Sequence, residues 1–394
     1  MSHDEEFYRE RRLPPYVFAE VNRMKQAYRS EGRDVIDFGM GNPDLAPAPH
    51  IIAKLAEVAA DPRAHRYSAS QGVPSLRKAL ARYYERRFDV GLNPDTEVCV
   101  TLGSKEGLAN LAQAITAPGD VILVPDPSYP IHMFGFLIAG AAVRPVGFKD
   151  PEDFLREAVH ACRRSIPAPS ALVLNFPSNP TAQVVDLDFY KEAVRIAKEN
   201  DLVLISDLAY SEIYFDGNPP PSILEVEGAK DVAVEFTSMS KTYSMPGWRM
   251  GFAAGSARLV DALKRVKSYL DYGAFTPIQI AAVAALDGPQ DHVAQARETY
   301  KKRRDVLVES FGRAGFHIPS PPATMFAWAP IPEPFAHLGS VEFAKKLLEE
   351  TDVAVAPGLG FGERGDTHVR LAVVENEQRI RQAARALKGF FAKG

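Results

Sequence analysis

The amino-acid sequence predicts an α/β fold built on a mostly parallel β-sheet. Between about residues 97 and 255, short apolar runs alternate with longer stretches whose apolar residues recur at helical spacing. Such alternation is typical of a sheet whose strands are buried on both faces by the helices that connect them. Sheets of this kind bind ligands at the carboxyl ends of their strands. Polar clusters follow several of the apolar runs directly, so we expect a binding site at that edge.

The elements expected in this section follow one another in regular order. Runs of four or five residues rich in Val, Leu and Ile predict strands at 98–102, 121–124, 172–175, 202–205 and 232–236. Apolar residues at helical spacing predict helices at 108–115, 131–139 and 187–200.

After about residue 290 the pattern changes to that of a smaller α+β unit. The expected elements are helices at 298–311, at 341–350 and up to about 391, and strands at 325–329, 353–356 and 368–373. Turns rich in proline separate the first helix from the first strand. We therefore expect a second domain at about 290–394.

Composition and charge exclude several classes of protein. The chain has 394 residues with 46% hydrophobic content, enough for two ordinary domains. Its 46 Lys and Arg against 50 Asp and Glu give a formal charge of 46 − 50 = −4, and no basic patch predicts a nucleic-acid partner. There is no apolar signal core at the N-terminus and no apolar run of about 18 residues, so we expect no membrane contact and a cytoplasmic location. Cys99 and Cys162 lack metal-type spacing, and we expect neither a disulfide nor a bound metal.

Lys241 lies in the segment that indicates a chemistry most strongly. An apolar strand leads into Ser238-Met239-Ser240-Lys241, and Arg249 follows eight residues later. A lysine that forms a Schiff base with an aldehyde cofactor needs a partly desolvated amine. The hydroxyls of Ser238 and Ser240 and the guanidinium of Arg249 suit a cofactor phosphate. The alternative is a strand, a polar turn and a second strand, with Lys241 exposed in the turn.

Two clusters earlier in the chain are open to two interpretations each. Ser104 lies between glycines after an apolar run, where the start of a helix could bind an anion or could be an ordinary capped turn. Tyr129 lies in a turn stiffened by prolines. Its ring could stack on a planar cofactor or could be half buried in the turn.

Two later clusters are equally open. Asn179 precedes a proline that keeps its backbone out of the helical region, so its amide could bind a ring hydroxyl; Asn-Pro is also a plain turn signal. Asp207 ends an apolar run, with Tyr210 three residues on. A buried carboxylate there needs a partner, which could be a protonated pyridine nitrogen or the N-terminus of a helix.

Together, in this order and spacing, these clusters resemble those of the fold-type-I pyridoxal-phosphate (PLP) aminotransferases over nearly the whole chain. Gly41-Asn42-Pro43-Asp44 and Arg370 complete the pattern. The resemblance implies a large PLP-binding domain at 46–289 with a mostly parallel seven-stranded sheet. It also implies that residues 1–45, with an N-terminal arm, join 290–394 in the small α+β domain, and that two chains form a homodimer with shared active sites.

The resemblance also implies a role for each site residue. Lys241 would carry the cofactor and move the proton, Asp207 would hold the pyridine nitrogen, and Tyr129 would stack on the ring. The other cofactor-binding residues that it implies are Ser104, Lys105, Asn179, Tyr210, Ser238, Ser240, Arg249 and, from the neighbouring subunit, Tyr67. The substrate-binding residues that it implies are Tyr16, Gly41, Asn179, Tyr272 and Arg370, of which Arg370 would hold the α-carboxylate. No arginine for a second carboxylate is identified.

Four segments narrow the resemblance to the bacterial glutamate–pyruvate (alanine) aminotransferases: 12–18, 207–210, 234–236 and 267–277. We therefore expect ping-pong transfer of the amino group from alanine to 2-oxoglutarate, giving pyruvate and glutamate. The alternatives are aspartate, methionine or LL-diaminopimelate aminotransferase and, further away, a PLP-dependent carbon–sulfur lyase. A transcription regulator on this scaffold would need an added DNA-binding module, and a non-catalytic binding protein would not need Lys241, Asp207 and Arg370 together.

Overall fold

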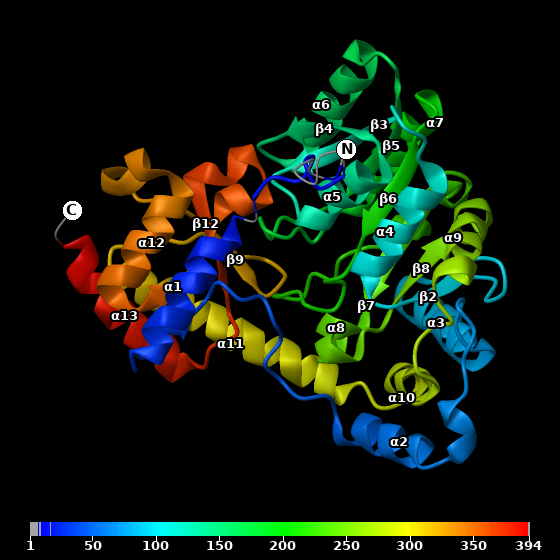
Figure 1. Ribbon diagram of the computed structural model, residues 1–394, viewed down its shortest axis with the longest axis horizontal. Coiled ribbons are helices and arrows are strands. Elements are labelled where there is room, and N and C mark those ends of the chain that lie inside the picture. Colours follow the sequence, from blue (N-terminus) through cyan, green and yellow to red (C-terminus); the bar gives the residue numbers. More distant parts are fainter. Residues whose placement is uncertain (1–6, 8, 16, 393–394) are drawn as a thin grey trace.

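The computed structural model describes residues 7, 9–15 and 17–392 (Figure 1). A seven-stranded sheet forms its centre, with the strand order β2-β8-β7-β6-β5-β3-β4. The strands are β2 (Val98–Thr101), β3 (Val121–Asp126), β4 (Ala142–Gly147), β5 (Pro169–Leu174), β6 (Val203–Asp207), β7 (Ala233–Ser238) and β8 (Gly251–Gly255). Only β8 runs antiparallel to its neighbours among these pairs. The predicted α/β class and mostly parallel sheet are confirmed.

Helices cover both faces of this sheet. One face carries α4 (Ser104–Ile115), α5 (Pro130–Ala139) and α9 (Ala257–Leu270) in one apolar core. The other face carries α2 (Pro49–Ala59), α3 (Pro74–Phe88), α6 (Pro151–Arg164), α7 (Leu187–Glu199) and α10 (Thr276–Asp287). Neighbouring strand residues alternate between the two cores: Cys99 packs on the α4 side, and Val98 and Val100 on the α3 side. This alternation is the period of two that a doubly covered sheet requires.

Proline begins several of these helices. Pro49, Pro74, Pro130 and Pro151 each occupy the first turn, where the missing N–H costs nothing and the fixed φ suits a helix. The carboxylate of Asp150 caps α6 by accepting the N–H of Asp153. The high proline content of the chain therefore marks helix starts as well as loops.

A third apolar core lies beside the sheet, to the left in Figure 1. It joins α1 (Phe18–Ser30), α11 (Asp291–Arg313), α12 (Gly339–Thr351) and α13 (Glu377–Phe391). An antiparallel sheet of order β11-β12-β9 packs there, from β11 (Ala356–Pro357), β12 (His368–Ala372) and β9 (Phe326–Pro330). The early β1 (Ile36–Asp37) pairs in parallel with the late β10 (Val353–Ala354). We propose the division into 46–289 and 1–45 plus 290–394, which the separate core and this pairing support.

Several elements differ from the predicted ones. The strand predicted at 353–356 is two short strands, because Val353 and Ala354 pair with β1 whereas Ala356 and Pro357 pair with β12. Helix α4 begins directly at Ser104, and α11 is 23 residues long and begins at Asp291. No pattern in the sequence predicted β1, β4, β8 or the helices α1 to α3, α6, α9 and α10. β8 reads Gly-Phe-Ala-Ala-Gly, in which only Phe252 favours a strand, so its conformation depends on pairing with β2 and β7.

Short 3-10 helices complete the described chain at Pro62–His65, Ile223–Glu225, Ala229–Asp231, Pro246–Trp248, Glu333–Leu338, Gly358–Phe361 and Glu363–Thr367. Cys99 is buried and Cys162 half-buried, both as free thiols. Among the residues that the structure describes, no helix combines the length and apolar character needed to cross a bilayer.

Candidate active site

A cavity of about 440 Å³ opens at the carboxyl ends of the sheet strands, against the third core. The predicted site residues that line it are Gly41, Ser104, Lys105, Tyr129, Asn179, Asp207, Tyr210, Ser238, Ser240, Lys241, Arg249 and Arg370. Residues more than 300 positions apart in the sequence therefore meet at one cavity. Phe18, Val21 and Asn22 of α1 also line it, and none of the three was predicted as a site residue.

Lys241 lies at the edge of this cavity in the single helical turn α8 (Met239–Thr242), directly after β7. The side chain of Ser238 caps this turn by accepting the N–H of Ser240 at 3.2 Å. Burial, followed by the positive charges of Arg370 and Arg249, lowers the pKa of Lys241 to about 8, against the opposing effect of Asp207. A neutral, nucleophilic amine is therefore accessible near neutral pH.

Asp207 ends β6 and is buried, with its two oxygens in different situations. Oδ2 is 2.9 Å from Nε2 of His132, whose Nδ1 is 2.7 Å from the hydroxyl of Ser128. An ionised carboxylate only accepts, so Nε2 is the donor in that contact, and in the tautomer with a bare Nδ1 the hydroxyl of Ser128 donates to Nδ1. Oδ1 is buried without a hydrogen-bond partner among the described residues. A buried carboxylate oxygen needs a donor, and a protonated ring nitrogen would supply one.

His132 and Asn175 are site residues that the sequence analysis missed. Asn175 donates from Nδ2 to the carbonyl of Asp207 at 3.0 Å and accepts the N–H of Asn179 at 2.9 Å. It therefore ties the ends of two neighbouring strands together. The four-residue spacing between Ser128 and His132 was the available signal, because such a pair can meet across one turn.

The start of α4 and Arg249 form one end of the cavity. Ser104 is the first residue of α4, after Gly103 at φ 85°. Arg249 adopts left-handed backbone (φ 55°) and donates to the carbonyls of Pro246 (2.8 Å) and Leu102 (3.3 Å). A Cβ at Gly103 would lie only 2.3 Å from Nη2 of Arg249, so glycine is needed for this approach. The unpaired N–H groups of a helix start and a guanidinium suit a phosphate.

Arg370 lies in the middle of β12 at the opposite side of the cavity. Its guanidinium donates to Oδ1 of Asn179 at 2.9 Å and to the carbonyl of Gly39 at 3.2 Å. The rings of Phe326 and Phe361 lie 4.0 and 4.6 Å from its central carbon. These contacts hold the guanidinium in place before any ligand arrives, as a bidentate carboxylate site requires.

Gly41 lies against this arginine. A Cβ at Gly41 would be 2.7 Å from the ring of Phe326 and 3.3 Å from Nη2 of Arg370. The ring of Phe326 therefore leaves no room for a side chain here, and glycine lets the backbone lie beside the guanidinium.

Two predicted site residues, Tyr67 and Tyr272, do not line the cavity of their own chain. Tyr67 and Tyr272 are 86% and 64% exposed, and their rings lie against each other with centroids 4.6 Å apart. They project from the surface, so their roles in a partner's site stay predictions. Tyr16 lies outside the described residues.

Known proteins resemble this chain over almost its whole length. The family model described as Aminotransferase class I and II matches residues 33–387. AatC of Rhizobium meliloti (strain 1021) is 65% identical over 98% of this chain and 96% of its own length. The glutamate-pyruvate aminotransferase AlaC of Escherichia coli (strain K12) is 54% identical over 98% and 93%, respectively.

More distant proteins share the same architecture. An LL-diaminopimelate aminotransferase of Dehalococcoides mccartyi (strain ATCC BAA-2266 / KCTC 15142 / 195) is 43% identical over 96% of this chain and 97% of its own. The substrate-bound structure of BacF from Bacillus subtilis superposes with a TM-score of 0.91 at 34% identity, over 98% of both chains. With the matched family model, these likenesses assign the fold and the general reaction: the chain belongs to the class I and II aminotransferase family.

Proposed function

We propose that this chain uses PLP to move an amino group from alanine to 2-oxoglutarate, giving pyruvate and glutamate by a ping-pong mechanism. The observation that carries the proposal is the pairing of two groups in one cavity. These are a lysine whose pKa is lowered to about 8 and a buried carboxylate oxygen without a partner among the described residues. The first suits the aldehyde of PLP, and the second suits its protonated ring nitrogen.

In this proposal the residues around the ring fix its position and its charge. When bound, PLP supplies the electron-accepting ring that stabilises the negative charge left on the substrate α-carbon. Asp207 keeps the ring nitrogen protonated, and His132 with Ser128 holds that carboxylate at hydrogen-bond distance. Tyr129 would lie against the ring, and the side chains of Asn179 and Tyr210 would hold its phenolic oxygen.

The phosphate and the substrate occupy opposite ends of the cavity in this proposal. Ser104, Lys105 (through its N–H), Ser238, Ser240 and Arg249 hold the phosphate. Arg370, with Asn179 and the N–H of Gly41, holds the substrate α-carboxylate. Lys241 Nζ then takes the proton from the α-carbon and returns it on the cofactor side, as general base and acid.

The choice of alanine rests on relatives more than on geometry. The likeness to AlaC at 54% identity supports it. The LL-diaminopimelate aminotransferase at 43% identity supports the main alternative, and aspartate and methionine are further candidates. The remaining alternative, a carbon–sulfur lyase, would use the same lysine and carboxylate without leaving pyridoxamine phosphate.

We also propose that the active unit is a homodimer in the cytoplasm. The exposed pair Tyr67 and Tyr272 supports the dimer, because two large rings in contact on the surface suit an interface. Each tyrosine would then complete the cavity of the partner chain.

Two measurements test the chemistry and the substrate separately. Borohydride reduction of the PLP-loaded enzyme, followed by peptide mapping, should label Lys241; a label on another lysine would disprove the covalent assignment. Donor amino acids are then scored for conversion of bound PLP to the pyridoxamine form, and 2-oxo acids for its reversal. Alanine and 2-oxoglutarate should rank among the fastest. Faster conversion by LL-diaminopimelate or methionine would replace the substrate, and pyruvate release without the pyridoxamine form would indicate a lyase.

A further inference from the structure

The loop that carries Tyr210 connects the large sheet to the third core. It starts at Leu208, whose N–H donates to the carbonyl of Phe236 on β7 at 2.8 Å. Tyr210 and Ile213 then pack in the third core, where the carbonyl of Ile213 accepts the N–H of Thr324 at 2.8 Å. Tyr210, which lines the cavity, therefore lies on a segment that contacts both the large sheet and the third core, so its position depends on the contacts of that segment.

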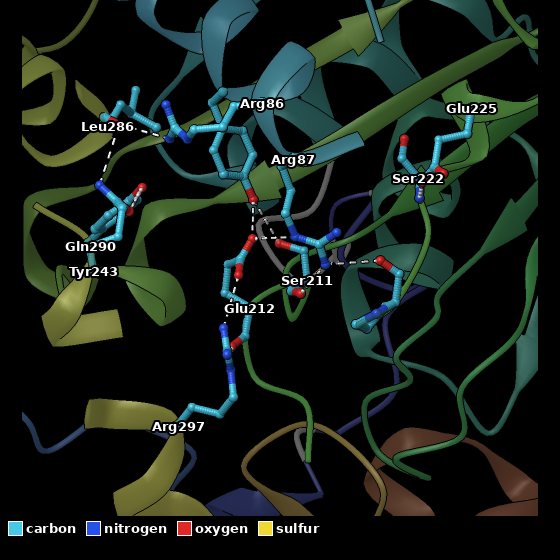
Figure 2. A network of polar contacts seen from close by, with 12 residues as sticks. Arg86, Arg87, Ser211, Glu212, Ser222, Glu225, Tyr243, Leu286, Gln290 and Arg297 are labelled. Carbon is cyan, nitrogen blue, oxygen red and sulfur yellow. Dashed lines mark hydrogen bonds and ion pairs between the residues drawn. The ribbon is translucent and has the colours of Figure 1, made fainter. Parts of the chain in front are cut away.

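The carboxylate of Glu212 lies at the centre of the contacts that hold this loop (Figure 2). Glu212 is buried, and Oε1 accepts from the hydroxyl of Tyr83 and from Nε of Arg87, both at 2.9 Å. Oε2 accepts from Nη2 of Arg297 at 3.2 Å. Tyr83 and Arg87 belong to α3, which packs on the sheet, and Arg297 belongs to α11, which enters the third core. The Glu212 carboxylate thus connects α3 on the large sheet with α11 of the third core.

The same side chains also hold the backbone of the loop. Nε of Arg297 donates to the carbonyl of Glu212 at 3.0 Å, and the α3 guanidinium donates to the carbonyl of Ser211 at 3.3 Å. The turn closes with a hydrogen bond from the N–H of Ile213 to the carbonyl of Tyr210 at 3.1 Å. Glu212 lies inside that turn, so a shift of its carboxylate displaces the tyrosine with it.

We propose that Glu212 is a positioning residue for the cofactor, acting through Tyr210. This inference rests on the role proposed above for Tyr210 at the phenolic oxygen. A hydroxyl makes a strong hydrogen bond only within a narrow range of distance and angle, so a small displacement of the loop weakens the contact. Replacing the carboxylate leaves the guanidiniums of Arg87 and Arg297 without their shared partner, so that, of their contacts, only the hydrogen bonds to backbone carbonyls still hold the loop.

A double-mutant cycle separates this role from simple stabilisation of the fold. Tyr210→Phe should weaken PLP binding roughly tenfold, as expected for one lost hydrogen bond to a charged oxygen. Glu212→Gln should weaken PLP binding by a similar factor, roughly tenfold, in the Tyr210 enzyme. Added to Tyr210→Phe, it should change binding less than about twofold, because the contact through which it acts is already absent.

A spectral measurement provides a second readout. The phenolic hydrogen bond stabilises the deprotonated ring oxygen. Its loss therefore raises the midpoint pH of the change in the absorption spectrum of bound PLP. Glu212→Gln and Tyr210→Phe should both raise this pH, and the double variant should raise it no further than Tyr210→Phe alone.

Asp95→Asn is the matched control. Asp95 pairs at 3.0 Å with the buried Arg77 of α3, and among the described residues neither of the two is hydrogen-bonded to the Tyr210 loop. This variant should lower the thermal unfolding midpoint while leaving PLP affinity within about twofold. If Glu212→Gln does not fold, Tyr83→Phe carries the same cycle, since it keeps the buried ring and removes one donor to Glu212 together with the 3.3 Å contact between the Tyr83 and Ser211 hydroxyls of the same network. Its expected weakening is about threefold with Tyr210 present and none without it.

Three results would overturn the inference. Equal weakening of PLP binding in both backgrounds would mean that Glu212 acts independently of Tyr210. Normal binding by Glu212→Gln, while Tyr210→Phe binds weakly, would mean that the loop holds its place without the carboxylate. Normal binding by Tyr210→Phe would remove the role proposed for that tyrosine and the inference with it, whereas labelling of Lys241 by borohydride would be unaffected.

Discussion

Replacing Asp207 with asparagine should lower kcat without lowering the free energy of unfolding of the PLP-free protein. Its Oδ2 accepts from His132 at 2.9 Å, whereas Oδ1 is buried with no partner among the described residues. The asparagine oxygen can keep the bond to His132, and the amide NH₂ then faces the cavity. An NH₂ group only donates, so it cannot accept from a protonated ring nitrogen, and the ring becomes a weaker electron acceptor.

The expected size of both effects follows from this geometry. One preorganised electrostatic contact at the reacting group contributes about 3–4 kcal/mol, so kcat at saturating PLP should fall about 100- to 1000-fold. In the PLP-free protein the substitution removes a buried charge with one unsatisfied oxygen, so the free energy of unfolding should stay equal or rise by about 1 kcal/mol.

The assay compares the wild type and Asp207→Asn in three measurements: the single-turnover rate of the alanine half-reaction, PLP affinity, and thermal unfolding without PLP. His132→Gln is the companion variant, since it removes the ring that holds the carboxylate and keeps Asp207 itself. It should retain more activity than Asp207→Asn. Turnover of Asp207→Asn within about threefold of wild type would refute the reasoning, and so would a large loss of stability in the PLP-free protein.

Four further predictions concern the rest of the site. Arg370→Lys should lower kcat/KM for every donor by a factor that corresponds to about 2–5 kcal/mol of lost transition-state stabilisation, because lysine cannot form the bidentate pair. Unchanged kcat/KM would exclude the carboxylate role. With the pKa of Lys241 at about 8, its reaction with an amine-directed reagent in the PLP-free protein should rise through about pH 8, since only the neutral amine reacts. The rise should move to higher pH in Arg370→Met, because Arg370 is one of the charges that lower that pKa, and a rise near pH 10 in the wild type would contradict the burial argument. Gly103→Ala should weaken PLP binding at least about tenfold, since its Cβ would meet Nη2 of Arg249 at 2.3 Å and φ is positive; titration with PLP checks this, and normal affinity would show that the guanidinium moves freely. Tyr67→Phe chains mixed with Lys241→Ala chains should form hybrids with one native site, because Tyr67 of one chain would complete the site that holds Lys241 of the other. Activity that does not depend on mixing would refute the shared site.

Much of the candidate site could be predicted because its chemistry is local in sequence. Lys241 follows Ser238 and Ser240 in one turn, and Asp207 ends its strand, so short motifs carry both residues. His132 and Asn175 could not be predicted with the same ease, since they act on Asp207 across 75 and 32 positions. Their partners are set by the packing of strands and helices, which no short motif records.

The sequence by itself determined the fold class, the reaction family and the lysine on which the proposed chemistry depends. Apolar periodicity and strand-following polar residues express the burial of the sheet and the edge where ligands bind. Only the tertiary structure decided how the site is completed. Arg370 meets Asn179 across 191 positions because β12 of the third core packs against the sheet edge. β8 is a strand because two neighbouring strands pair with its backbone. Glu212 accepts hydrogen bonds from arginines of α3 and α11 because the Tyr210 loop lies between these helices. Each of these depends on contacts between distant segments, whose geometry arises from the packing of the whole chain.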